Sequence, residues 1–240
     1  MGGAITSEAL RAAAAIVAPG VTTRAIDQAV EQVIVGRGGQ PSFKGFNGFP
    51  AASCVSVNEE VVHGIPGPRT LSEGDIVAID VGVRYRGLYS DAALSLPVGT
   101  VSEETLRLLS VTKAALYRGI REACAGNWVR DISRAVQEEV EHAGYHVVRD
   151  LVGHGVGHHV HEEPQVPNFV GPFRGRRLLE GMVVAIEPMV NMGGSKVKTL
   201  ADGWTVVTSD GSLSAHFEHT VAVTPHGGEI LTEGWDVTEP

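Results

Sequence analysis

The sequence is short of cysteine and of basic charge, and it has no long apolar run. Two cysteines in 240 residues cannot form a disulfide framework, and no Asn-x-Ser/Thr acceptor site occurs. The longest wholly apolar run, residues 12–19, is too short to span a bilayer. The N-terminus has no basic segment leading into a signal-type apolar core. We therefore expect a cytoplasmic protein.

The charge balance argues against a nucleic-acid-binding face. Lys and Arg number 19 against 28 Asp and Glu, which gives a net charge of −9. Binding to phosphates requires clustered Lys and Arg, so we expect no DNA partner. Hydrophobic residues make up 43% of the chain, which is enough to bury a core. The composition therefore indicates a globular protein.

Two pairs of similar segments recur at nearly the same spacing. Residues 71–80 read LSEGDIVAID and residues 178–187 read LLEGMVVAIE, at an offset of 107. Residues 24–30 resemble residues 130–136 at an offset of 106. Chance similarity between Val/Ile/Ala runs is the alternative, but both members of the first pair end in a carboxylate. We interpret the pattern as a duplication.

The periodicity predicts helix pairs that alternate with blocks of strands. Helical patterns cover residues 7–18, 22–35, 102–124 and 131–143. Strand patterns cover residues 75–83, 88–96, 182–190 and 214–224. This order is typical of an α+β fold, with helices packed on one face of an antiparallel sheet. No Pro/Ser-rich linker divides the chain, so we predict one domain over residues 1–240, with pseudo-repeats of about 5–100 and 101–224.

Two aspartates fall in the hairpin that the first two strands would form. A turn centred on Tyr85 and Arg86 places Asp80 directly opposite Asp91, with Cβ atoms about 5 Å apart. An ionised carboxylate in an apolar strand costs several kcal/mol, and two neighbouring carboxylates raise each other's pKa. A divalent metal between them is one solution. Neutralisation by a turn arginine, or a register slip that separates the pair, is the alternative.

The second half of the chain carries matching carboxylates. Glu187 is the repeat mate of Asp80, and Glu218 stands in a context similar to that of Asp91. Four carboxylates directed at one centre cannot all stay ionised without a partner. Two divalent cations would balance the four charges. The sequence therefore predicts a site for two metals between the halves.

Four of the ten histidines crowd residues 153–164. The glycines there do not follow the G-x-G-x-x-G order of a phosphate loop, and Pro164 would break the helix that a His-Glu-x-x-His zinc site needs. We expect the glycines to let the backbone approach a metal or a substrate closely. The residue types alone do not choose among these four histidines, and His63, before a Pro/Gly turn, is a separate candidate. The four are His154, His158, His159 and His161.

Several motifs stand in a fixed order along the chain. They are SVNEEVVHGIP at 56–66, GDIVAID at 74–80, SD at 90–91, GHGVGHHVHEEP at 153–164, GMVVAIEP at 181–188 and FEHT at 217–220. Together they resemble the type I methionine aminopeptidases of metallopeptidase family M24, whose architecture is called the pita-bread fold. Only 30 residues separate Glu187 from Glu218, which leaves no room for the insert of the type II enzymes.

The resemblance implies a metal-dependent aminopeptidase. Such an enzyme removes the N-terminal methionine from nascent polypeptides when the second residue is small. The implied cofactors are two divalent ions per chain, drawn from Co, Mn, Fe and Zn. The implied partners are nascent peptides and the ribosome, and the implied state is a monomer. The implied metal ligands are Asp80, Asp91, His154, Glu187 and Glu218.

The resemblance also implies a mechanism and a substrate site. A hydroxide bridging the two metals would attack the first peptide bond. Glu187 would carry the proton to the leaving amine, His161 would donate to the oxyanion, and His63 would position the scissile amide. The implied substrate-binding residues are His63, His161, Phe46, Phe49, Cys54, Val160 and Trp204. Val160 stands where relatives often carry Phe.

Three other functions share parts of this pattern. An Xaa-Pro aminopeptidase or dipeptidase would use the same five ligands but usually carries a large extra N-terminal domain. A non-catalytic binding module would keep the fold without the metals. A creatinase-like amidinohydrolase would not need four carboxylates. The presence of every ligand type favours the methionine aminopeptidase.

Overall fold

The computed structural model describes residues 1–235, and it contains two pairs of helices. Their bounds are α1 (Gly2–Ala14), α2 (Thr23–Gly36), α3 (Glu103–Glu122) and α4 (Val129–His142), with a short 3₁₀ turn η1 at Phe46–Gly48. The hydroxyls of Thr22 and Ser102 cap α2 and α3 by accepting the N–H groups of Ala25 and Thr105. The predicted helices at 22–35, 102–124 and 131–143 are confirmed to within a few residues at each end.

The first helix differs from the prediction. The periodicity placed it at residues 7–18, whereas α1 begins at Gly2 and ends at Ala14. A Cβ on Gly3 would lie 1.9 Å from the carbonyl oxygen of Leu231, so the first turn packs directly on the backbone near residue 231. Glycine is a poor helix former, and the periodic pattern therefore did not indicate that the helix starts here. The helix also ends well before Pro19, which therefore does not terminate it.

The strands form one large sheet and two small ones. Their bounds are β1 (Gln40–Pro41), β2 (Cys54–Val57), β3 (Glu60–Val62), β4 (Ile76–Tyr85), β5 (Leu88–Pro97), β6 (His146–Val147), β7 (Val152–Gly155), β8 (Glu162–Pro167), β9 (Val183–Ile186), β10 (Met189–Asn191), β11 (Val197–Thr199), β12 (Val206–Thr208), β13 (Ser214–His216), β14 (Glu218–Thr224) and β15 (Gly227–Ile230). The nine-stranded sheet has the order β1-β4-β5-β14-β9-β7-β8, with β2 on β4 and β15 on β14. The small sheets are β13-β10-β6 and β11-β12-β3.

Two predicted strands are each divided between two sheets. Residues 182–190 separate at Pro188 into β9, in the large sheet, and β10, in a small sheet. Residues 214–224 separate at Phe217 into β13, in that small sheet, and β14, in the large one. The apolar runs are continuous, so periodicity does not reveal the bends. The chain therefore changes sheet at two places.

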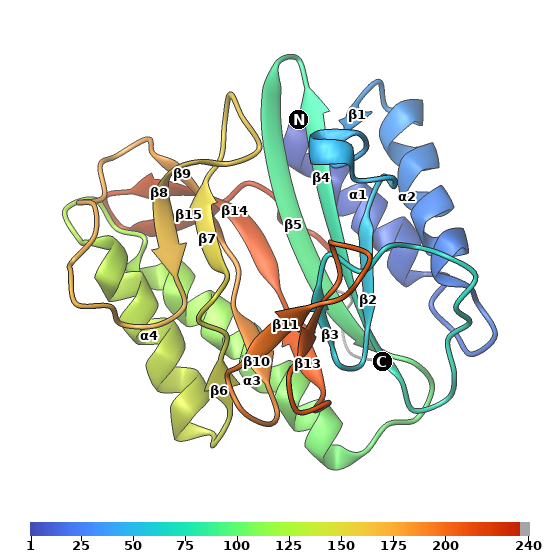
Figure 1. Cartoon of the computed structure of the whole chain (residues 1–240). Helices are drawn as coiled ribbons and strands as arrows, with labels where there is room; N and C mark the ends of the chain where they lie inside the picture. Colours follow the sequence, from blue (N-terminus) through green and yellow to red (C-terminus); the bar gives the residue numbers. More distant parts are fainter. Residues whose placement is uncertain (236–240) are drawn as a thin grey trace.

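The helices cover one face of the large sheet, as the α+β prediction requires. Helices α1 and α2 contact the β4–β5 half of the sheet, and α4 contacts β8 at the other end (Figure 1). Alternate residues of β4, including Ile79 and Val81, join the main core together with Leu10 and Ile26 of the helices. Because strand side chains alternate between faces, Asp80 points to the face that the helices do not cover.

The hairpin of β4 and β5 has a different register from the one predicted. The two-residue turn is Arg86-Gly87, and both residues have positive φ, at 51° and 85°. Such a turn matches the right-handed twist of the paired strands. It places Asp80 opposite Ala93 and Asp91 opposite Gly82. The predicted direct pairing is therefore wrong by two residues, but a shift of two keeps both aspartates on one face.

Helix pairs precede strands in both halves of the chain, which is the order that a duplication would produce; the duplication itself stays a prediction.

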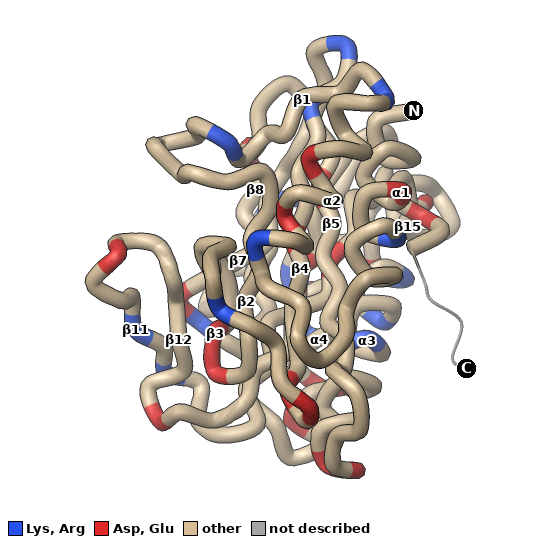
Figure 2. The backbone as a smooth tube through the Cα atoms, turned by 90° about the vertical axis from the view of Figure 1, so that its right-hand side faces the viewer, with Lys and Arg blue, Asp and Glu red and all other residues tan. Residues whose placement is uncertain are grey.

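Lys and Arg positions are spread over several parts of the periphery (Figure 2). Among residues 1–235, no helix combines the length and the apolar character that crossing a membrane requires.

One side chain fastens the two halves of the large sheet to each other. The hydroxyl of Thr220 in β14 accepts the N–H of Asp91 at 2.8 Å and donates to its carbonyl oxygen at 2.7 Å. The hydroxyl therefore takes the place of a ladder pair between β5 and β14. We predict that Thr220→Val lowers the free energy of unfolding by about 2–4 kcal/mol, because two buried backbone groups lose their partner. Urea unfolding measures the effect.

The matched variant is Thr220→Ser, which keeps the hydroxyl and loses one methyl group. We expect it to cost only about 1 kcal/mol. Equal destabilisation by Val and Ser would show that the methyl packing, and not the hydroxyl, matters at this position.

Candidate metal centre and substrate cavity

The five predicted metal ligands come from neighbouring strands in the middle of the large sheet. Asp80 lies in β4, Asp91 in β5, Glu218 in β14 and His154 in β7, while Glu187 directly follows β9. The register brings them close, because Asp80 and Glu218 both pair with Ala93, and His154 pairs with Ala185. The order β4-β5-β14-β9-β7 can be followed in Figure 1.

Side-chain atoms of four candidate ligands lie close together. One atom each from Asp91, His154 and Glu218 lie within 4.8 Å of one another. Nε2 of His154 is 3.4 Å from Oε1 of Glu187. Among residues 1–235, Oδ1 of Asp80, Oδ1 of Asp91 and Oε1 of Glu218 are buried without a hydrogen-bond partner. Buried carboxylate oxygens that lack donors, beside one imidazole, fit hard divalent cations.

Burial is the main cause of the pKa shifts of all five groups. Burial, with the neighbouring negative charges, raises the pKa of Asp80, Glu187 and Glu218 well above the ordinary range. Burial raises the pKa of Asp91 to about 6. Burial lowers the pKa of His154 to about 4, so its imidazole is neutral at pH 7. Without a cation the centre therefore resists ionisation.

A cavity of about 670 Å³ opens over the carboxylates. Most of the predicted substrate residues line it, and they are Phe46, Phe49, Cys54, His63, His161 and Trp204. Val160 is buried but is not among the lining residues. Side chains that the sequence analysis missed also line it, and they include Phe43, Asn47, Leu151, Gln165 and Met189.

The structure distinguishes the four crowded histidines. His154 and His161 line the cavity with ring centroids 4.3 Å apart, whereas His158 and His159 lie outside the cavity lining. The ring of His161 also meets Phe46 edge-on at 5.5 Å, although the residue is exposed to solvent, as His158 and His159 are. Loss of part of its hydration lowers the pKa of His161, which favours the neutral imidazole.

Two of the neighbouring glycines lie close to the backbone of adjacent strands. A Cβ on Gly153 would lie 2.4 Å from the carbonyl oxygen of Ala185, and one on Gly155 would lie 2.4 Å from that of Glu163. These glycines therefore allow β7 to lie close to β9 and β8. Gly153 also lines the cavity, and the expected close approach to a metal or a substrate stays a prediction.

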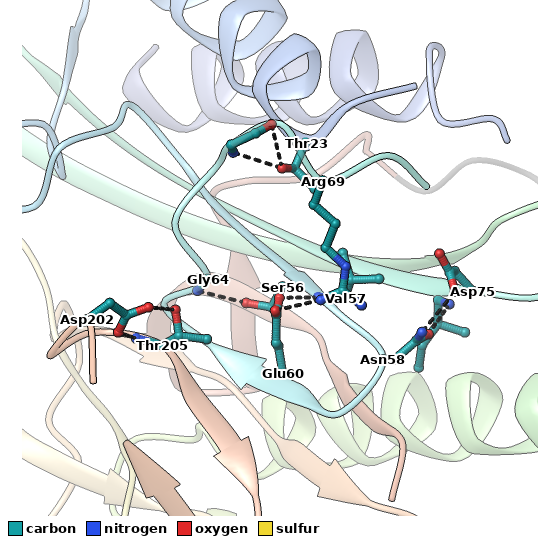
Figure 3. Close-up of polar contacts among 12 residues, drawn as sticks. Thr23, Ser56, Val57, Asn58, Glu60, Gly64, Arg69, Asp75, Asp202 and Thr205 are labelled. Atoms are coloured by element: carbon teal, nitrogen blue, oxygen red, sulfur yellow. Dashed lines mark hydrogen bonds and ion pairs between the residues drawn. The ribbon is translucent and has the colours of Figure 1, made fainter. Parts of the chain in front are cut away.

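His63 is held at the cavity by a tightly bonded segment. Its backbone has φ of +60°, an uncommon conformation that is often found at functional sites. The next N–H, that of Gly64, donates to Ser56 Oγ, and Glu60 accepts from the N–H of Val57 at 2.7 Å (Figure 3). An ion pair between Arg69 and Glu60 completes the brace. The ring of His63 therefore has a defined position.

An apolar wall faces the carboxylates. Phe49 and Cys54 are buried, and the ring of Trp204 meets that of Phe49 edge-on at 5.1 Å. The loop of Trp204 is braced by Asp202, which accepts from Thr205 Oγ1 at 2.7 Å (Figure 3). Burial keeps the pKa of Cys54 well above its ordinary value, so this wall is uncharged.

Sequence reasoning missed a further imidazole at the centre. Nε2 of His216 is 3.8 Å from Oε2 of Glu187, and the residue is fully buried at 1% exposure. Burial, with the nearby His63, lowers the pKa of His216 to about 3. The signal was a lone histidine in an apolar strand two residues before Glu218.

Comparisons with known proteins agree with this geometry. The model of metallopeptidase family M24 matches residues 2–225. A methionine aminopeptidase of Clostridium perfringens is 54% identical over 96% of this chain and 92% of its own length. Methionine aminopeptidase 1 of Bacillus subtilis is 53% identical over 89% of this chain and 86% of its own length.

Solved structures show the same architecture. The crystal structure of methionine aminopeptidase from Thermotoga maritima superposes with a TM-score of 0.95 at 45% identity, over 97% of this chain and 94% of that one. A prolidase from Pyrococcus furiosus superposes with a TM-score of 0.78 at 23% identity, over 97% and 62% of the two chains. The second likeness concerns the fold alone. The predicted pita-bread fold is confirmed.

We predict that the metal affinity of the centre rises with pH between 5 and 7. Below pH 6 the carboxyl of Asp91 is mostly protonated, and a metal must displace that proton. His154 stays neutral over this range and does not compete. The expected gain is about tenfold per pH unit for each proton displaced. Calorimetric titration with Mn(II) in two buffers of different ionisation enthalpy measures both the affinity and the released protons.

Asp91→Asn tests the same centre, because the amide is nearly isosteric and cannot ionise. We expect this variant to bind Mn(II) at least about 100-fold more weakly. Unchanged affinity in the variant, or an affinity that does not depend on pH in the wild type, would contradict a cation site formed by these carboxylates.

Proposed function

This chain belongs to metallopeptidase family M24, and we propose that it removes the N-terminal methionine from peptides whose second residue is small. One observation carries the proposal: four carboxylates and one imidazole, all of residue types that can bind metal, line a cavity with an apolar wall. High identity to methionine aminopeptidases along most of the chain supports the same activity.

We propose Asp80, Asp91, His154, Glu187 and Glu218 as the ligands of two divalent ions. Their oxygen-rich donor set suits Mn(II), Fe(II) or Co(II), with Zn(II) also compatible. When bound, such ions lower the pKa of water toward neutrality and polarise a carbonyl group. Assays of the metal-free protein reconstituted with each ion in turn identify the metal that supports activity.

The apolar wall would take the methionine side chain. Phe49, Cys54 and Trp204 offer uncharged surface to the thioether, which is flexible and polarizable. The free α-amino group of the substrate would lie over the carboxylates, so that only a chain terminus fits. Steric exclusion just beyond the cleaved bond would select small second residues.

Three side chains would act on the peptide bond. His161, neutral at the cavity wall, would donate its N–H to the carbonyl oxygen as negative charge develops there. Glu187 would take a proton from water and pass it to the leaving amine. His63 would orient the scissile amide from the segment that Figure 3 shows.

The resemblance supports a monomer and a ribosome partner, and the sequence composition supports a cytoplasmic setting. We propose a monomer that acts in the cytoplasm on nascent polypeptides as they leave the ribosome. Co-sedimentation with translating ribosomes tests the partner, and sedimentation of the free protein tests the monomer.

We expect the Mn-loaded protein to release methionine rapidly from Met-Gly-Met-Met and far more slowly from a matched Met-Leu-Met-Met peptide. Mass spectrometry of the products measures both rates. A Met-Pro dipeptide serves as the control for an Xaa-Pro peptidase. Preferred cleavage of Met-Pro, or no release from Met-Gly-Met-Met with any of the four metals, would contradict the proposal.

We further predict that His161→Ala lowers kcat by about 100-fold, the loss typical of one oxyanion donor. Since His161 is not a proposed ligand, the metal content of the variant should equal that of the wild type. An unchanged kcat, or a loss explained by missing metal, would remove His161 from the mechanism.

A further inference from the structure

His216 is a buried imidazole for which the proposed mechanism has no role. It ends β13 and pairs with Met189 of β10 in the small sheet that lies beside the large one (Figure 1). The backbone N–H of His216 donates to Ser95 Oγ at 2.9 Å, and the backbone carbonyl oxygen of His216 accepts from the same hydroxyl at 2.8 Å. The backbone of His216 is therefore fixed to β5 on one side and to β10 on the other.

The ring of His216 is directed at a single group. Its Nε2 lies 3.8 Å from Oε2 of Glu187 and has no hydrogen-bond partner among residues 1–235. A buried polar atom without a partner is destabilising, so the position calls for an explanation. A small movement of the carboxylate would bring the two atoms within hydrogen-bond distance.

Glu187 is the predicted ligand that most needs such support. Asp80, Asp91, His154 and Glu218 lie within strands, whereas Glu187 follows the last residue of β9 at the bend between two sheets. Its backbone is held, because its carbonyl oxygen accepts from Asn168 Nδ2 at 2.9 Å. Its longer side chain has more freedom than that of an aspartate.

The two oxygens of this carboxylate face two different imidazoles. Oε1 is 3.4 Å from His154, which lines the cavity. Oε2 faces His216, which lies behind the carboxylate and outside the cavity lining. One oxygen therefore serves the metal centre, and the other is available for a hydrogen bond that orients the group.

We propose that His216 is a positioning residue that donates its Nε2–H to Oε2 of Glu187 and so directs Oε1 toward the metal centre. The inference rests on the proposed function, because orientation matters only if Glu187 binds metal and carries the proton. Hydrogen-bond partners behind a metal-binding carboxylate commonly contribute 10–100-fold to metal affinity, which is about the size of effect we expect here.

Two variants with side chains of similar length test the proposal. His216→Gln keeps an N–H donor close to the position of Nε2, and His216→Met fills similar space without a donor. We expect His216→Met to weaken Mn(II) binding by about 10–100-fold and to lower kcat with little change in KM. His216→Gln should stay within about threefold of the wild type in both.

Thermal unfolding of the two metal-free variants is the control for packing. A purely structural role would shift the stability of the variants without separating their metal affinities. Equal Mn(II) affinity of the Gln and Met variants, whether both unchanged or both lost, would overturn the donor role.

A measurement on the wild type does not depend on whether the variants fold. Nitrogen-15 NMR of the histidine rings in the metal-free protein reports which nitrogen of His216 carries the proton. We expect Nε2 to be protonated, and an unprotonated Nε2 would overturn the proposal. Failure of the wild type to release methionine would contradict the proposed function, whereas the ring tautomer and the Mn(II) titrations still decide the role of His216.

Discussion

Mutual repulsion among four carboxylates is the constraint on which the rest of this structure depends. Two unit charges 4 Å apart repel by about 4 kcal/mol at an effective dielectric constant of 20. The metal-free centre avoids this energy by holding protons. For Asp91, whose ordinary pKa is 3.8, the protonated form stabilises the fold at low pH, and that contribution is lost as the pH rises through about 6. A bound cation removes the conflict at neutral pH.

A sheet with helices on one face can hold several carboxylates close together on the other face. Neighbouring strands place side chains about 5 Å apart on one face, which is close enough for several groups to share a cation. The other face, with residues such as Ile79 and Val81, packs into the main core. The energy that holds the charges together therefore comes from apolar burial on the opposite side of the same strands. Thr220 joins β5 and β14 at Asp91, one of these carboxylates.

The sequence allowed the shared face of Asp80 and Asp91 to be predicted, because strand side chains alternate with a period of two. The register of the β4–β5 hairpin could not be predicted, because it depends on a positive φ at Arg86 that this residue type rarely adopts. The residue types alone did not choose His154 and His161 over their two neighbours, for a similar reason, although the family resemblance did. That choice depends on the path of the connection between β7 and β8, for which the sequence carries no periodic signal.

Short strands such as β2, β7 and β8 were not predicted, and two further errors fall at the bends where the chain changes sheet. Apolar runs cross residue 217 and the Glu187-Pro188 step without interruption, so a single strand was predicted at each. The bends bring β10 against β13 and thereby set His216 behind Glu187. The four other candidate ligands lie within strands, where neighbouring residues restrain them, whereas Glu187 lies at a bend. In the proposed arrangement His216 supplies the restraint that the bend removes. The bend is also the feature that a periodic pattern cannot reveal.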